Sequence, residues 1–161
     1  MALDNASVQR VQEALREAGS HAEVLALAET ARSAQEAADS VGCILGAIVK
    51  SLVFAIGDQP VMALVAGDRQ CDTKALPAAL GLEGKVKRAS ADQVREATGF
   101  AIGGVSPVGH PAPIPMVIDA SLTRFETVYA AAGHPHCVFA TSVEDLQRIT
   151  GAAVSDSVGL A

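Results

Sequence analysis

The chain has 161 residues; half of them are hydrophobic and 19% are charged, which favours a folded globular protein over a disordered one. Its formal net charge of −6 disfavours broad binding of nucleic acid by bulk attraction, and an aromatic content of 3% removes the stacking platforms of RRM and OB-type single-strand binders. Three cysteines without a CxxC spacing argue against a disulfide framework and against a zinc site.

Helix and strand signals alternate irregularly along the first half of the chain. Apolar residues at helical spacing, capping pairs such as Ser33 with Glu36, and the turn at 57–60 divide it into segments. The expected elements are an amphipathic helix over 8–18, a short strand over 23–27, a helix from 34 to near 42, a strand over 48–56 and a strand over 61–66 that forms a hairpin with it.

The second half continues in the same mixed manner. A helix is expected from 72 or 73 to 80, and Pro77 predicts that it begins late or bends. The remaining expected elements are an exposed basic strand over 85–89, a helix over 90–98, a Gly/Pro-rich stretch over 100–115, a strand over 116–118, a turn or helix from 119, a strand over 127–131, a turn over 133–136, a strand over 137–140, a helix over 142–150 and a tail over 154–161.

These elements predict a single α+β domain over residues 1–161, with one mixed, mostly antiparallel sheet. No apolar run reaches about 18 residues, so we expect no transmembrane helix. The N-terminal segment lacks the basic and apolar regions of a secretory signal, so we expect a cytoplasmic protein.

One charge interrupts the most apolar stretch, residues 41–56 (VGCILGAIVKSLVFAI). Burying the ammonium of Lys50 without a partner would cost several kcal/mol, so this group must be paired, reach a cavity or meet a ligand. The alternative is that Lys50 extends to the surface from an edge strand.

A second unusual stretch is the Gly103-Gly104-Val105-Ser106-Pro107 segment. The two glycines allow the backbone to come close to a ligand, and Pro107 stiffens the loop. A rigid loop with free N–H groups suits an oxyanion or a phosphate, although a plain structural turn would have the same composition.

Other candidate groups are weaker. His134 and His136 could contact a substrate or ligate a metal, but no third ligand cluster lies nearby, so we expect no metal. Ser51 and Ser106 lie outside any G-x-S-x-G elbow, and Cys137 near the histidines could act as a nucleophile only with suitable geometry.

Three segments together resemble a known family: AIVKSLVF at 47–54, GFAIGGVSPVGH at 99–110 with PMVID at 115–119, and AAGHPHCVF at 131–139 followed by SVEDL. Their order and spacing are similar to the YbaK/ProX-type aminoacyl-tRNA deacylases, relatives of the editing domain inserted in bacterial prolyl-tRNA synthetases. The resemblance covers roughly residues 20–155, and it implies a sheet curled into a partial barrel and a metal-free hydrolase without a cofactor.

The resemblance also implies roles for particular residues. The essential lysine of the family falls on Lys50, and its Gly-x-x-x-Pro motif falls on Gly103 to Pro107. His134 and His136 lie in a variable pocket segment that is more basic and Gly-rich in YbaK itself. Specificity for Cys-tRNA is therefore not implied, and seryl, threonyl, alanyl and non-protein amino acids remain open.

The residues and the resemblance lead to one functional hypothesis. Lys50 would bind a phosphate of the tRNA 3′ end, the N–H groups of Gly103, Gly104, Val105 and Ser106 would stabilise an oxyanion, and Ile48 would line the pocket on the side of Lys50. The expected partner is a mischarged aminoacyl-tRNA, with a synthetase or an elongation factor as a further candidate, and neither a membrane nor duplex DNA. The alternatives are a non-catalytic module that binds a ligand, tRNA or a synthetase, and a hydrolase of small aminoacyl esters.

Overall fold

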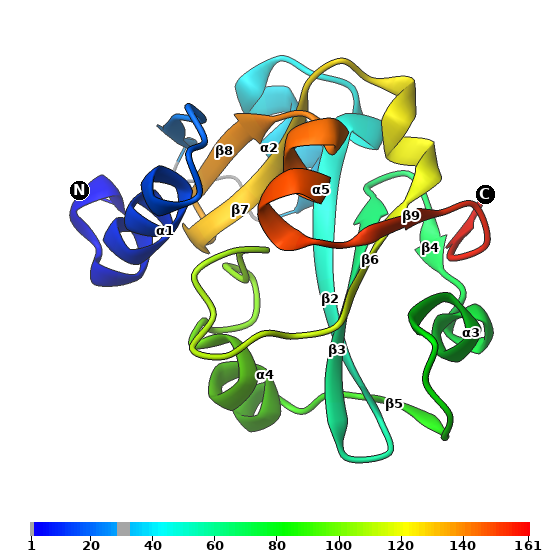
Figure 1. Cartoon of the computed structure of the whole chain (residues 1–161). Helices are drawn as coiled ribbons and strands as arrows, with labels where there is room; N and C mark the ends of the chain where they lie inside the picture. The colour runs from blue at the N-terminus through cyan, green and yellow to red at the C-terminus, as the bar shows by residue number, and fades with distance from the viewer. Residues whose placement is uncertain (1, 29–32) are drawn as a thin grey trace.

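A computed structural model of the chain describes residues 2–28 and 33–161. A mixed sheet curls into a half-barrel, and helices cover its faces and ends (Figure 1). The helices are α1 Ala6–Glu17, α2 Ala34–Val41, α3 Leu76–Leu80, α4 Ala91–Thr98 and α5 Val143–Thr150, with the 3-10 turns η1 Ala2–Asp4, η2 Leu45–Ala47, η3 Thr73–Ala75 and η4 Ala120–Arg124. Among the described residues, no helix combines the length and the apolar character needed to cross a bilayer.

The main sheet has the strand order β1-β8-β7-β2-β3-β6-β9, and β5 also pairs with β2. A separate pair joins β4 to β10. The strands are β1 Val24–Ala26, β2 Ile48–Ile56, β3 Gln59–Ala66, β4 Gln70–Cys71, β5 Val86–Arg88, β6 Met116–Asp119, β7 Val128–His134, β8 Cys137–Thr141, β9 Ala153–Ser155 and β10 Gly159–Leu160. Parallel pairs (β2–β7, β3–β6 and β6–β9) occur beside antiparallel ones, so the predicted mixed sheet and partial barrel are confirmed.

Local sequence signals explain where most elements begin. The hydroxyls of Ser33, Ser90 and Ser142 each accept a hydrogen bond from a backbone N–H in the first turn of the helix that follows. Pro77 lies in the first turn of α3, so this helix begins late, as its sequence predicted. The predicted hairpin is β2–β3, paired from Val49–Ala66 to Ile56–Gln59.

Two expectations about loops were wrong. The predicted tail contains two strands, because β9 adds to the edge of β6 in parallel and β10 pairs with β4. The predicted turn at 133–136 is shorter, because β7 continues through Gly133 to His134 after an irregularity in its pairing with β8. Both differences come from pairing with distant strands, which local composition does not report.

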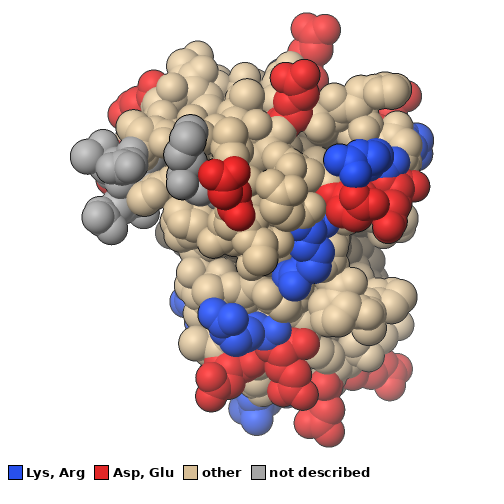
Figure 2. Space-filling view, turned by 90° about the vertical axis from the view of Figure 1, so that its left-hand side faces the viewer, with Lys and Arg blue, Asp and Glu red and all other residues tan. Residues whose placement is uncertain are grey.

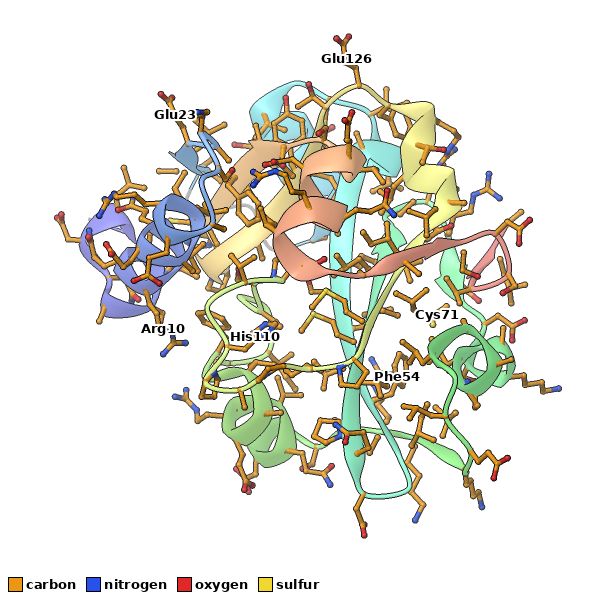
Figure 3. The ribbon with its side chains drawn as sticks, in the orientation of Figure 1. Arg10, Glu23, Phe54, Cys71, His110 and Glu126 are labelled. Carbon is orange, nitrogen blue, oxygen red and sulfur yellow. The ribbon has the colours of Figure 1, made fainter. Side chains whose placement is uncertain are left out.

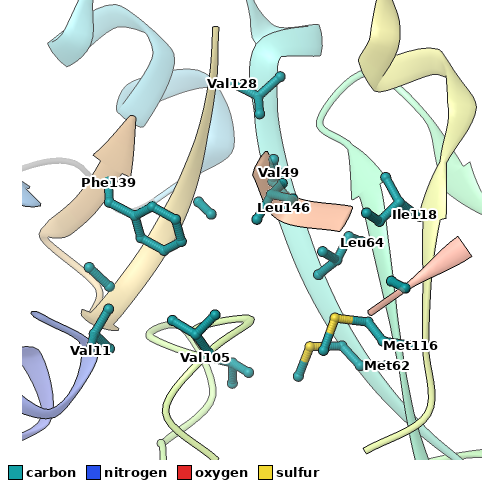
Figure 4. Close-up of a cluster of buried hydrophobic side chains, with 14 of the residues drawn as sticks. Val11, Val49, Met62, Leu64, Val105, Met116, Ile118, Val128, Phe139 and Leu146 are labelled. Atoms are coloured by element: carbon teal, nitrogen blue, oxygen red, sulfur yellow. The ribbon is translucent and has the colours of Figure 1, made fainter. Parts of the chain in front are cut away.

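The largest hydrophobic core lies on one face of β2 and β3 (Figure 4). It joins Val49, Met62 and Leu64 from these strands to Phe139 from β8 and to Val11 from α1. A second cluster occupies the opposite face of the same two strands, because successive side chains of a strand point to opposite sides. Strand β2 therefore has hydrophobic clusters on both faces, and its residues are buried or half-buried.

Candidate active site

One edge of β2 is only partly paired. Its other edge pairs with β3 along almost its whole length. The partly paired edge meets β7 at Ile48 and Val49 and meets β5 from Phe54 to Ile56. Residues 50–53 therefore have no partner strand on this edge among the described residues, and the sheet has a gap there.

A cavity of about 760 Å³ opens at this gap. Because side chains on both faces of β2 border the gap, the cavity receives consecutive residues of the strand rather than alternate ones. Other walls come from α2, β4, β5, the Gly103 loop and the β7–β8 turn. The described residues that line it are Leu27, Ser33, Ala34, Ala37, Ile48, Val49, Lys50, Ser51, Leu52, Val53, Phe54, Gln70, Cys71, Thr73, Arg88, Ala89, Val94, Ile102, Gly103, Val105, Tyr129, Ala131, Pro135, Cys137 and Val138.

Lys50 lies half-buried on the floor of this cavity. Its ammonium donates a hydrogen bond to the backbone carbonyl of Arg69. The turn that carries this carbonyl is itself fixed, because Asp68 accepts two hydrogen bonds of 2.9 and 2.7 Å from Arg124. No described carboxylate forms an ion pair with Lys50. The ammonium therefore has further N–H groups for an anionic ligand.

The Gly103–Pro107 loop contributes another part of the wall. Gly103 and Val105 line the cavity, whereas Gly104, Ser106 and Pro107 are not among its lining residues. Gly103 has a φ of +97°, a backbone conformation that residues other than glycine rarely adopt. Gly104 lies so close to β7 that a Cβ there would be 2.9 Å from the backbone of His134. Gly103 therefore allows the conformation of the loop, and Gly104 allows the loop to pack closely against β7.

Helix α1 and His110 support this loop from behind. Arg10 donates a hydrogen bond of 2.9 Å to the Gly99 carbonyl, and its guanidinium lies 4.3 Å above the Phe100 ring. His110 packs edge-on against the same ring, and its Nε2 lies 2.7 Å from the Ser106 carbonyl oxygen. Burial lowers the pKa of His110, the hydrogen bond to Ser106 opposes this effect, and Arg10 adds a smaller lowering. Figure 3 shows Arg10 and His110 on the same side of the molecule.

The histidine pair lies beside the cavity rather than in its wall. Nδ1 of His134 accepts a hydrogen bond of 3.0 Å from the His136 N–H, and the two ring centroids are 5.3 Å apart. The lining residue of this turn is Pro135, between them. The described residues contain no group of three or more His, Cys, Asp or Glu side chains placed to hold a metal ion.

The charge inside the cavity differs from the charge of the whole chain. Lys50 and Arg88 line the cavity, and no described Asp or Glu does. On the outer surface, basic side chains lie next to acidic ones on the face shown in Figure 2, rather than in one continuous basic patch. The cavity therefore favours an anionic ligand although the chain has a net charge of −6.

The model of the aminoacyl-tRNA editing domain matches residues 28–149. The chain belongs to the aminoacyl-tRNA editing-domain family. The match includes the gap in β2, the Gly103 loop and the His134 turn, so the resemblance inferred from the three sequence segments is confirmed.

Individual relatives of this editing domain agree with that assignment. A crystal structure provisionally described as a trans-editing enzyme for prolyl tRNA synthetase is 40% identical, with a TM-score of 0.91 over 98% of this chain and 99% of that one. The uncharacterized protein YwhH of Bacillus subtilis is 34% identical over 117 residues, 72% of this chain and 73% of YwhH. EbsC of Enterococcus faecalis, provisionally named a Cys-tRNA(Pro)/Cys-tRNA(Cys) deacylase, is 31% identical over 103 residues, 63% of this chain and 62% of EbsC.

Sequence reasoning missed one wall of the cavity in this editing domain. Gln70, Cys71 and Thr73 come from β4 and the turn after it, and β4 is too short to have a sequence pattern. Burial raises the pKa of the Cys71 thiol to about 11; Asp72 adds to the effect and Lys50 opposes it. Cys71 was expected to be a buried apolar residue, but it is half-buried and part of the cavity wall.

Proposed function

We propose that the chain is a trans-acting deacylase that hydrolyses the ester bond of a mischarged aminoacyl-tRNA. The observation that carries this proposal is the cavity at the gap in β2, which is lined by both Lys50 and the Gly103 loop. Membership of the editing-domain family and the names given to two relatives support it.

Binding of the tRNA 3′ end would depend on Lys50. A compact ammonium suits a phosphate, and the contact with the Arg69 carbonyl holds it in the cavity while leaving N–H groups free. Arg88 lines the same cavity and would add a second positive charge near the backbone of the 3′ end.

Hydrolysis would proceed by attack of water on the ester carbonyl. The bond between the carbonyl carbon and the ribose oxygen then breaks, and the ribose oxygen leaves with a proton. Backbone N–H groups of Gly103 and Val105, which line the cavity, would stabilise the developing oxyanion, at about 3–4 kcal/mol each by analogy with known oxyanion-hole donors. The expected contributions of Gly104 and Ser106 are not part of this proposal, because the Gly104 N–H already donates a hydrogen bond of 3.1 Å to the Ala101 carbonyl and neither residue lines the cavity. The 2′-hydroxyl of the terminal adenosine or a backbone carbonyl would orient the water.

The acyl pocket would be formed by Ile48 and Val105, which line the cavity with Lys50 and Gly103. Ser106 and Pro107 would act through the shape of the loop, and His134 and His136 through the position of Pro135. Seryl, threonyl, alanyl and non-protein amino acids are all candidate substrates. The proposal includes a cytoplasmic, metal-independent and cofactor-free reaction on aminoacyl-tRNA released from a synthetase, with a synthetase or elongation factor as a further partner.

Replacing Lys50 with Met tests the proposal, because Met keeps the length of the side chain and removes the charge. Wild type and variant are incubated with a panel of mischarged tRNAs, and the remaining ester is measured. We expect the Lys50→Met rate to fall by roughly 10²-fold or more, since a charge-assisted contact is lost. Lys85→Met, an exposed lysine outside the cavity wall, is the matched control and should keep its rate.

The panel also distinguishes the main alternative, a non-catalytic module that binds a ligand, tRNA or a synthetase. The net charge of −6 favours this alternative, because it suits a tRNA hydrolase poorly. Loss of ester above the uncatalysed rate for any member of the panel excludes it. Hydrolysis that is unchanged in a folded Lys50→Met variant would refute the role of Lys50.

A further inference from the structure

Ser51 presents its peptide groups to the gap in β2. The Ile48 carbonyl accepts a hydrogen bond of 2.7 Å from Gly67, on the side of β3. The Val53 carbonyl accepts one of 3.3 Å from Ala89, on the opposite edge. Because the peptide groups of successive strand residues face alternate edges, the N–H and C=O of Ser51 face the partly paired edge, where no described strand meets them.

The hydroxyl of Ser51 adds a further unpaired polar group. Its Oγ is buried and has no hydrogen-bond partner among the described residues. It lies on the core side of β2 with Val49 and Val53, whereas Lys50 points to the other side. Buried hydroxyls in native proteins are nearly always hydrogen-bonded, so this one indicates a partner that binds beside it.

The charges of the cavity and of the proposed substrate indicate which group binds beside the Ser51 hydroxyl. The proposed substrate carries two kinds of charge: a phosphate near the ribose and an α-ammonium group on the amino acid. Lys50 and Arg88 suit the phosphate, but no described carboxylate lines the cavity to meet the ammonium. Neutral oxygen acceptors suit it instead, and Ser51 offers two that have no partner among the described residues, its carbonyl and its hydroxyl.

Resting on the proposed deacylase function, we propose that Ser51 binds the α-ammonium group of the aminoacyl ester at the gap in β2. The ammonium donates to the Ser51 carbonyl oxygen and, after rotation of the side chain, to its hydroxyl. Lys50 stays on the other side of the strand, so the two cations remain apart. The substrate class is therefore restricted to esters of amino acids with a free α-amino group, and N-blocked esters such as peptidyl-tRNA are excluded.

A pair of esters tests this inference in the wild-type protein. Alanyl-, seryl- and threonyl-tRNA are assayed, and the fastest is compared with the α-hydroxy ester made from it by deamination with nitrous acid. The α-hydroxy ester has nearly the same size and lacks the ammonium. With each rate divided by the uncatalysed rate of the same ester, we expect the amino ester to be favoured at least about tenfold, as a hydrogen bond to a charged group implies.

Two isosteric variants then locate the contact. Ser51→Thr keeps the hydroxyl and Ser51→Val removes it, and both suit a strand. Hydrolysis of the amino ester should be about tenfold slower in Ser51→Val than in Ser51→Thr, whereas the hydroxy ester should be hydrolysed equally by both. Thermal melting checks that the variants fold, and the ester pair still decides the question if Ser51→Val does not.

The outcomes separate this inference from the function on which it rests. No hydrolysis of any aminoacyl-tRNA by the wild type refutes the proposed function and this inference with it. Equal enhancement of the amino and hydroxy esters refutes binding of the α-ammonium group at Ser51, and equal rates for Ser51→Val and Ser51→Thr on the amino ester refute the contact with the Ser51 hydroxyl; both results leave the deacylase function standing.

Discussion

The contact between Gly104 and β7 gives a quantitative prediction for Gly104→Ala. The new Cβ would lie 2.9 Å from Cα and N of His134 and 3.1 Å from the Gly133 carbonyl carbon. Ordinary contacts between carbon atoms begin at about 3.5 Å, so the two segments must separate by roughly 0.6 Å. Strand β7 has no room to move back, because Gly133 is in turn so close to α1 that a Cβ on it would lie 2.7 Å from the Ser7 carbonyl oxygen. The Gly103–Pro107 loop must therefore move.

The expected cost has two parts. Overpacking of this kind destabilises a fold by about 1–3 kcal/mol, which lowers the melting temperature of a domain of this size by roughly 2–12 °C. Catalytic groups need to be held within about 0.5 Å of their productive positions, so the shift of the loop should lower kcat for ester hydrolysis by roughly 10²-fold. Thermal melting and the deacylation assay measure the two effects separately.

Gly42→Ala is the matched control. Gly42 ends α2 with a φ of +80°, and a Cβ on it would meet nothing within 4 Å. This variant should lose about 1 kcal/mol of stability from backbone strain alone and keep its activity. If Gly104→Ala folds and hydrolyses the ester within about threefold of the wild-type rate, the close contact does not position the loop and the argument fails.

Two further predictions concern ionisable groups. Because burial lowers the pKa of His110 below its ordinary 6.5, the stability that the neutral ring contributes is fully present above about pH 6.5 and is lost as the pH falls through the folded pKa. The free energy of unfolding in urea should therefore decrease between about pH 7.5 and about pH 5 more in the wild type than in His110→Gln; equal decreases would refute the assignment. Because its pKa of about 11 exceeds the ordinary 9.0, Cys71 should react with iodoacetamide at about pH 8 roughly 10²-fold more slowly than an unperturbed thiol, as measured by peptide mass spectrometry; rapid labelling would contradict this.

The parts of the fold that sequence predicted are those set by local chemistry. Ser33, Ser90 and Ser142 cap helices where their hydroxyls can reach first-turn N–H groups, and a short turn joins β2 to β3. The strands β9 and β10 were missed because their partners, β6 and β4, lie far away in the sequence. Local composition cannot report a partner of this kind.

The candidate site also has features that the sequence predicts and features that it does not. Lys50 stands out in the sequence because a charge in an apolar strand needs an explanation, and the glycines at 103 and 104 stand out by their composition. The gap in β2 could not be predicted, because it depends on where β7 stops pairing and β5 starts. Because the gap is not visible in the sequence, nothing there distinguishes the backbone of Ser51 from that of other strand residues.

The contacts of α1 and β10 also bear on how this protein can be dissected. The family match ends at residues 28 and 149, so it leaves out α1, β1, β9 and β10. A fragment cut at those limits would lose the helix behind the Gly103 loop, expose the core that Val8, Val11 and Leu15 cover, and leave β4 without its partner among the described strands. The family match therefore includes the Lys50 strand and the Gly103 loop, whereas excision or transplantation into another protein should also include the flanking helix and the last strands.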